Sequence, residues 1–223
     1  MAGNSRISLI VRIRRTAGWQ DYPLTLPEPA YVLDALEEAG RQDPSLLFRH
    51  ACHHASCGSC GLRVDGRERL ACITPLREVI RPKRPLRLEP LRNFPLLGDL
   101  LVDFRPFMAR LDRIDLPLVR RAEAQLANGA GYQRFENCIE CGLCLSACPI
   151  AGSDPLYLGP AALAAAWRVV EEPRQGDPNH ALRSVAGEHG AWRCHAAFEC
   201  TEVCPANVDP AHAIMSLRRL LLK

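Results

Sequence analysis

The stretch CIECGLCLSACP, residues 138–149, holds four cysteines at the spacing C-x2-C-x2-C-x3-C, followed by a proline. Thiolates at this spacing are typical of [4Fe-4S] clusters, and the fourth cysteine of such a run binds a different cluster from the first three. The motif therefore predicts one [4Fe-4S] cluster on Cys138, Cys141 and Cys144, with Cys148 directed to a second cluster. A structural zinc site is the alternative that such thiolates leave open.

The stretch WRCHAAFECTEVCPANVDP, residues 192–210, repeats this spacing with one place changed. Its cysteines are Cys194, Cys200 and Cys204, and Ala197 stands at the remaining place. By the same crossover, Cys204 before Pro205 completes the [4Fe-4S] ligand set. The thiolates left for the other cluster are Cys148, Cys194 and Cys200. Because alanine occupies the place of the fourth ligand, we expect a [3Fe-4S] cluster there.

A third group of cysteines lies in the first half of the chain and has the spacing C-x4-C-x2-C-x11-C. Its members are Cys52, Cys57, Cys60 and Cys72. The first three places match plant-type [2Fe-2S] proteins, in which a distant cysteine completes the four ligands. A zinc site and a Rieske-type centre using His53 or His54 are the alternatives. Since four cysteines already fill the places, we expect both histidines to be loop or interface residues.

The segments around the first cysteine group predict a compact α+β domain. Residues 7–13 and 22–26 favour a strand hairpin, and residues 31–40 favour an amphipathic helix that stops at Gly40. Two further strands flank the Asp65-Gly66 turn, and residues 87–90 favour another strand.

The second half of the chain is predicted to be helical. The segments with helical periodicity are 96–111, 116–127, 160–172 and 209–222. The last has Asp209 as the N-cap and Pro210 at the first helical position. A proline and a glycine in 91–100 favour a boundary there, which predicts domains over 1–95 and 96–223.

Composition restricts the function further. The chain has 223 residues, a net charge of +3 and 48% hydrophobic residues. Its basic residues form no block, so we expect no nucleic-acid partner. Neither a secretory signal nor a run of about 20 apolar residues is present. The eleven cysteines are an odd number, which favours metal binding over a disulfide framework. No Gly-x-Gly-x-x-Gly motif for a flavin or nicotinamide is found.

Three stretches carry a resemblance to a known family: SCGSCGLRVDGRERLACITP, NCIECGLCLSACP and WRCHAAFECTEVCPANVDP. In this order they resemble the iron-sulfur subunit of succinate dehydrogenase and fumarate reductase (respiratory complex II), and the resemblance covers nearly the whole chain. It implies an N-terminal plant-ferredoxin-like (β-grasp) domain that faces a flavoprotein subunit. It also implies an all-α, bacterial-ferredoxin-like C-terminal domain that faces membrane anchor subunits.

The resemblance implies that electrons pass between the FAD of the flavoprotein subunit and a quinone through [2Fe-2S], [4Fe-4S] and [3Fe-4S] clusters. The same three cysteine sets are the implied ligands. The chain would lie peripherally on the cytoplasmic side of the cell membrane, held through the anchor subunits. Haem b in a partner subunit and the direction of electron flow are left open.

On the quinone side the resemblance implies Pro149 and His195 as residues beside the three-iron cluster. Ubiquinone-using members usually carry tryptophans shortly after the Cys-Pro pair, where this chain has Gly152 and Ser153. This difference favours menaquinone, or a site displaced into the anchor. For His195, a hydrogen bond to the cluster surroundings is the alternative role.

Two other functions are compatible with the cysteine motifs. One is the iron-sulfur subunit of another flavoprotein dehydrogenase, although such subunits tend to carry two complete four-cysteine runs and further paired-cysteine modules. The other is a free soluble ferredoxin-type carrier that needs no partner.

Overall fold

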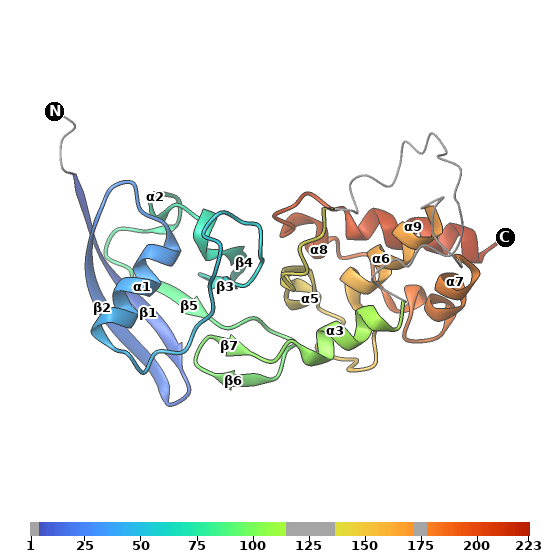
Figure 1. Ribbon diagram of the computed structural model, residues 1–223, viewed down its shortest axis with the longest axis horizontal. Helices are drawn as coiled ribbons and strands as arrows, with labels where there is room; N and C mark the ends of the chain where they lie inside the picture. The colour runs from blue at the N-terminus through green and yellow to red at the C-terminus, as the bar shows by residue number, and fades with distance from the viewer. Residues whose placement is uncertain (1–4, 115–136, 172–177) are drawn as a thin grey trace. The chain divides into compact units, whose positions relative to one another are not determined.

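A computed structural model describes residues 5–114, 137–171 and 178–223. The chain divides into two compact units, Met1–Asp103 and Phe104–Lys223 (Figure 1). The first unit contains the sheet and the second is helical, so the predicted change of character along the chain is confirmed.

The N-terminal unit is built on a mixed five-stranded sheet in the order β2-β1-β5-β3-β4. The strands are β1 (Arg6–Arg15), β2 (Gly18–Pro27), β3 (Gly61–Val64), β4 (Arg67–Leu70) and β5 (Leu86–Glu89). Antiparallel hairpins join β1 to β2 and β3 to β4, while β5 runs parallel to β1 and antiparallel to β3. All the strands predicted for residues 7–90 are present.

The helix α1 (Val32–Gln42) packs against β2 and against the short 3-10 helix η1 (Ala71–Ile73) (Figure 1). It begins where the Asp34 side chain accepts a hydrogen bond from the Tyr31 backbone N–H at 2.7 Å. Its apolar face is buried and consists of Val32, Leu33, Ala35, Leu36 and Ala39.

The prediction that Gly40 ends this helix is wrong, because α1 continues to Gln42. A Cβ atom at Gly40 would lie 3.2 Å from the Phe48 ring. Glycine therefore serves the close approach of an aromatic side chain here, and not the left-handed turn that a helix stop requires.

The segment 96–111 is also different from the prediction. Its first part is a two-stranded hairpin, β6 (Leu96–Gly98) and β7 (Leu101–Val102), and helix α3 begins only at Arg105 (Arg105–Asp112). At the turn, the buried Asp99 accepts hydrogen bonds from the backbone N–H groups of Thr16 and Leu47. These tertiary contacts hold the turn and override the helical periodicity. Segment 116–127, predicted as a helix, lies outside the described residues.

In the C-terminal unit, α6 (Gly159–Glu171) and α9 (Pro210–Leu221) pack against each other, and α7 (Pro178–Ala186) contacts both. The described residues of this unit also form α3, introduced above, and the short helices α5 (Leu143–Ala147), η2 (Ala191–Arg193) and α8 (Glu199–Glu202). The predicted helices at 160–172 and 209–222 are confirmed. The Asp209 side chain caps α9 by accepting the backbone N–H of His212 at 3.0 Å.

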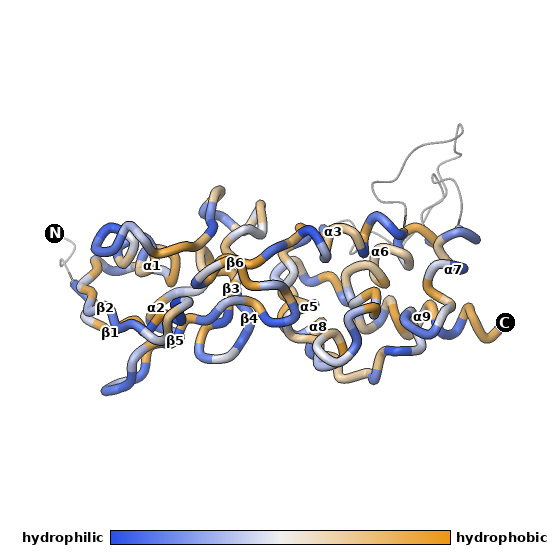
Figure 2. Tube along the Cα trace, turned by 90° about the horizontal axis from the view of Figure 1, so that it is seen from below, coloured by the Kyte–Doolittle hydropathy of each residue, from blue (hydrophilic) through white to orange (hydrophobic). Residues whose placement is uncertain are grey.

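Within the described residues, no helix is both long enough and apolar enough to span a bilayer. Along α9, Figure 2 shows hydrophilic and hydrophobic residues within the same helix.

Candidate iron-sulfur cluster sites

The first cysteine group lies on the loop between α1 and β3 and on the nearby helix η1. Cys52 and Cys57 lie on this loop, Cys60 directly precedes β3, and Cys72 lies in η1. The Cys52 and Cys57 side chains are neighbours, as are those of Cys60 and Cys72. The Ala55 N–H, on the loop, donates to the Cys72 Sγ at 3.3 Å, so the two pairs form one group. The structure therefore brings together all four predicted residues.

The loop directs backbone N–H groups at sulfur. His53, Ala55 and Gly58 adopt left-handed conformations, with φ between 60° and 67°. The N–H groups of Ser56 and Cys57 both donate to the Cys52 Sγ at 3.3 Å. Such donors stabilise thiolate charge and are one of the means by which a protein tunes a cluster's reduction potential.

The thiols in this group differ in their acidity. The backbone N–H of His54, together with that of Cys57, lowers the pKa of Cys52 to about 7. Burial raises the pKa of Cys60 to about 12. The buried thiol gives up its proton readily only when a cation such as iron compensates the charge, which fits a metal-binding role.

The second group lies in the helical unit, where Cys204 joins the cysteines of the 138–149 run. One cavity is lined by Cys138, Cys141, Cys144 and Cys204. Phe107 from α3 and Ala164 from α6 close it on the apolar side. Gly142 allows the run to turn into α5 with a φ of 76°. Since burial raises the pKa of Cys141 to about 12, this cavity too favours a thiolate only against a positive metal.

A second cavity of the same unit collects the remaining thiols. It is lined by Cys148, Cys194 and Cys200, together with Pro149, His195 and Ala197. Burial raises the pKa of Cys200 to about 12, and the Ala196 N–H donates to the Cys194 Sγ at 3.3 Å. Both residues predicted for the quinone side, and the alanine at the fourth place, thus lie beside the three thiols.

Two residues near this cavity belong to none of the cysteine motifs, and the sequence did not predict a role for them. Tyr157 is fully buried and lines the cavity, and its hydroxyl group makes no hydrogen bond to the described residues. Burial, followed by the neighbouring Cys194 and Cys148 thiols, raises its pKa. A buried hydroxyl without a partner fits a cavity that receives a group with acceptor atoms, such as the sulfides of a cluster.

The second residue is Arg218 on α9. Its guanidinium donates to the backbone carbonyls of Ala191 at 2.9 Å and Trp192 at 3.0 Å, and also to that of Cys194. These bonds anchor the segment that carries Cys194 to α9. Only the packing of α9 on η2 reveals this role, because Arg218 is 24 or more positions from the carbonyls that it binds.

Two family models match the chain. Residues 10–109 match the 2Fe-2S iron-sulfur cluster binding domain, and residues 134–208 match the 4Fe-4S dicluster domain. Together with the cysteine groups, these matches define a protein with two successive iron-sulfur modules.

Sequence similarity to known proteins identifies the family within this class of iron-sulfur proteins. The fumarate reductase iron-sulfur subunit of Mycobacterium tuberculosis is 38% identical over 206 residues, which are 88% of this chain and 83% of the relative. The succinate dehydrogenase iron-sulfur subunit of Coxiella burnetii is 30% identical over 92% of this chain and 90% of its own length. The chain belongs to this family of iron-sulfur subunits of fumarate reductase and succinate dehydrogenase, as the motifs predicted.

A solved structure shares the fold over nearly the whole chain. A chain of the Mycobacterium smegmatis Sdh1 complex in the apo form superposes with a TM-score of 0.87 at 23% identity, covering 97% of this chain and 96% of the other.

Proposed function

We propose that this chain relays electrons between the FAD of a flavoprotein subunit and a quinone, as part of a succinate:quinone oxidoreductase or quinol:fumarate reductase. The observation that carries the proposal is the arrangement of the cysteines. All eleven fall into the three groups of four, four and three that the motifs predict. Three unlike clusters in one chain suit single-electron steps between a two-electron flavin and a quinone.

The ligand sets follow the three groups. We propose a [2Fe-2S] cluster on Cys52, Cys57, Cys60 and Cys72, a [4Fe-4S] cluster on Cys138, Cys141, Cys144 and Cys204, and a [3Fe-4S] cluster on Cys148, Cys194 and Cys200. The contacts between Cys52 and Cys57 and between Cys60 and Cys72 support one iron for each of these pairs.

We further propose that the N-terminal unit is a plant-ferredoxin-like β-grasp domain and the C-terminal unit a bacterial-ferredoxin-like helical domain. The mixed sheet with α1 packed on it supports the first assignment. In the second unit, two cysteine-lined cavities between short helices support the other. We place the boundary between Asp103 and Phe104, because the β6–β7 hairpin groups with the N-terminal unit.

The cavity lined by Cys148, Cys194 and Cys200 is where we propose contact with the quinone and the membrane anchor. Phe198 lines this cavity and is 48% exposed, and Trp192 close by in the chain is 43% exposed. Exposed apolar side chains beside a redox centre suit a partner surface. His195 and Pro149 lie at the same cavity, and Gly152 and Ser153 favour menaquinone over ubiquinone. The chain would then lie peripherally on the cytoplasmic side of the membrane.

The test is to purify the chain from native membranes with detergent and to identify what accompanies it. We expect a flavoprotein, one or more anchor subunits, and iron and sulfide contents equal to the sum of the three clusters. Succinate should reduce the clusters, and a menaquinone analogue should reoxidise them. Recovery of a partner-free chain in a mild salt wash, still active in quinone reduction, would contradict the proposal.

A further inference from the structure

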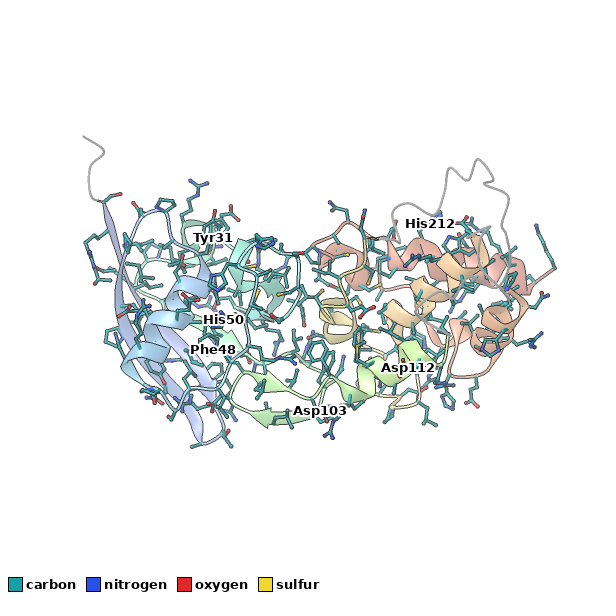
Figure 3. All side chains as sticks on the ribbon, in the orientation of Figure 1. Tyr31, Phe48, His50, Asp103, Asp112 and His212 are labelled. Carbon is teal, nitrogen blue, oxygen red and sulfur yellow. The ribbon has the colours of Figure 1, made fainter. Side chains whose placement is uncertain are left out.

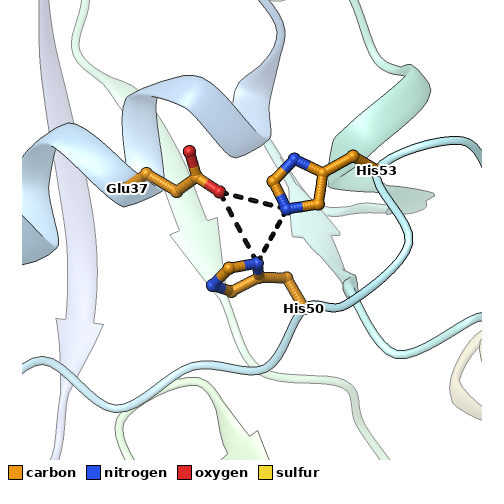
Figure 4. A group of neighbouring side chains, drawn as sticks. All are labelled: Glu37, His50 and His53. Carbon is orange, nitrogen blue, oxygen red and sulfur yellow. Dashed lines mark hydrogen bonds and ion pairs between the residues drawn. The ribbon is translucent and has the colours of Figure 1, made fainter.

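Three side chains outside the cysteine groups converge on one point of the N-terminal unit. They are Glu37 of α1 and His50 and His53 of the loop that follows (Figure 4). The His50 Nδ1 lies 3.0 Å from the His53 Nε2. The Glu37 Oε1 lies 3.5 Å from the first of these nitrogens and 3.3 Å from the second. One ligand-type atom from each residue thus faces the other two.

Neighbouring contacts hold these side chains in place. The His50 ring stacks on Phe48, with centroids 5.3 Å apart and planes 18° from parallel (Figure 3). Phe48 is itself positioned by its approach to Gly40 of α1. His53 stands edge-on to the His50 ring at a centroid distance of 5.1 Å. Because α1 is anchored through its buried face, Glu37 is presented from a rigid element.

We propose that Glu37, His50 and His53 form a binding site for a zinc-type divalent cation. Bonds of about 2.0–2.1 Å from zinc to nitrogen and oxygen place neighbouring ligand atoms of a tetrahedron about 3.3–3.4 Å apart. The three observed separations lie on both sides of that value. Two imidazoles with one carboxylate suit zinc better than magnesium or calcium, which prefer oxygen ligands. Three protein ligands leave the fourth position to water.

The site is separate from the [2Fe-2S] ligands, although His53 follows Cys52 directly. The His53 Nε2 faces His50 and Glu37, so this nitrogen is engaged by two residues outside the cysteine group. A bound cation would bridge α1 and the cluster-binding loop. The proposal is independent of the electron-transfer function, since it requires only these three side chains and their packing.

The proposed site is accessible to solvent, so a cation bound there can exchange. The side chains of Glu37, His50 and His53 are 26%, 35% and 47% exposed. We therefore expect a chelator to remove the cation while the iron-sulfur clusters stay in place.

The experiment uses the full chain with its clusters assembled, treated with a chelator and then dialysed against zinc chloride. We expect one zinc per chain by mass spectrometry of the metal content. X-ray absorption at the zinc edge, which does not detect iron, should show nitrogen and oxygen at about 2.0–2.1 Å with imidazole scattering. Glu37→Gln, His50→Gln and His53→Gln should each weaken zinc binding by about tenfold or more, since even outer-shell changes cost about 10–100-fold.

Two matched variants serve as controls. Glu38→Gln changes the next residue of α1, which pairs with Arg41, and His54→Gln changes an adjacent histidine of the same loop. Both should bind zinc as the unmodified chain does. The visible spectrum of the [2Fe-2S] cluster reports whether the loop is intact. If a histidine variant disturbs it, Glu37→Gln on the helix decides the question.

Three results would overturn the proposal. They are the absence of bound zinc, zinc binding that the Glu37→Gln variant leaves unchanged, and a zinc environment of sulfur at about 2.3 Å. The last would place the metal on the cysteines.

Discussion

Cys52 and Cys60 belong to one cysteine group, yet the protein shifts their pKa values in opposite directions. N–H donors lower the pKa of the first, and burial raises that of the second. Under the proposed pairing these thiols bind different irons. The sulfurs bound to the iron of the Cys52 pair would then have more hydrogen bonds and more contact with solvent than those of the Cys60 pair. On reduction, the iron of the Cys52 pair would therefore accept the additional electron more readily.

Ala197 allows a direct test of the three-iron assignment. In Ala197→Cys, a thiolate would stand at the missing corner, so the cluster should take up a fourth iron and become [4Fe-4S]. Electron paramagnetic resonance of the oxidised unmodified protein should show a three-iron signal that the variant lacks. Suppose instead that the anaerobically isolated protein has full iron content but no three-iron signal. A fourth ligand such as water, hydroxide or His195 would then complete the cube, and the assignment fails.

Tyr157 is expected to tune the same cluster. Its buried hydroxyl lacks a partner among the described residues and faces the cavity of Cys148, Cys194 and Cys200. A hydrogen bond to cluster sulfur stabilises the reduced form, so Tyr157→Phe should lower the reduction potential of the [3Fe-4S] cluster. A redox titration followed by paramagnetic resonance measures this. Tyr22→Phe in the N-terminal unit is the control, and an unchanged potential in Tyr157→Phe would exclude the hydrogen bond.

The roles of His53 and His54 decide between an all-cysteine [2Fe-2S] site and a Rieske-type centre. The His53 side chain contacts His50 and Glu37, and the His54 side chain contacts the Cys52 carbonyl. We expect the double variant His53→Ala with His54→Ala to keep the [2Fe-2S] spectrum. Disappearance of that spectrum, with the other clusters retained, would show that a histidine is a ligand.

At the scale of elements, one buried carboxylate attaches the β6–β7 hairpin to the rest of the N-terminal unit. Asp99 is 4% exposed, and it accepts the N–H groups of Thr16 at 2.9 Å and Leu47 at 3.0 Å. It also forms an ion pair with Arg15 at 3.1 Å. Burial acts to raise the pKa of Asp99, but these N–H groups and the Arg15 cation together hold it below its ordinary value. The carboxylate is therefore charged in the folded protein at neutral pH.

Replacing this charge should destabilise the unit. In Asp99→Asn, two buried N–H groups compete for one carbonyl oxygen, and Arg15 loses the negative charge that pairs with it. We therefore expect the free energy of unfolding to fall by about 2–4 kcal/mol. The temperature at which half of the [2Fe-2S] circular dichroism signal is lost on heating measures this change in stability. Asp21→Asn is the matched control. Its ion pair with Arg12 is exposed to solvent, so we expect a much smaller effect than for Asp99→Asn. Equal midpoints for the two variants would contradict a structural role for Asp99.

In the whole molecule, the three cysteine groups lie in two units, and exposed apolar side chains flank the group of Cys148, Cys194 and Cys200. A free carrier would be stable and monomeric alone. We expect this chain, produced without its partners, to aggregate or to lose the [3Fe-4S] signal first, because Trp192 and Phe198 would then be left uncovered. Gel filtration and paramagnetic resonance of the isolated chain measure both effects. A stable monomer that retains all three clusters would favour the free carrier.

The three cysteine groups were predicted from the sequence alone, because cysteines within each motif follow short spacings and the crossover between the two runs of the second half assigns the rest. It also predicted the strands up to residue 90 and helices α6 and α9, whose patterns are strong and local. The end of α1 and the β6–β7 hairpin were predicted wrongly. The first depends on Phe48, which lies outside the helix, and the second on Thr16, which is 83 positions from Asp99.

Which residues outside the motifs lie beside the cysteines, or beside one another, is evident only from the tertiary structure. Tyr157 lines the cavity of Cys148, Cys194 and Cys200, and Arg218 of α9 binds the carbonyls of the segment that carries Cys194. Glu37 meets the two histidines because α1 lies next to the loop that follows it. Arg218 and the Cys194 carbonyl are 24 positions apart, and Glu37 and His50 are 13 apart, so no spacing rule connects them. These contacts form because burying the apolar faces of the helices fixes where the polar side chains on the same helices must lie.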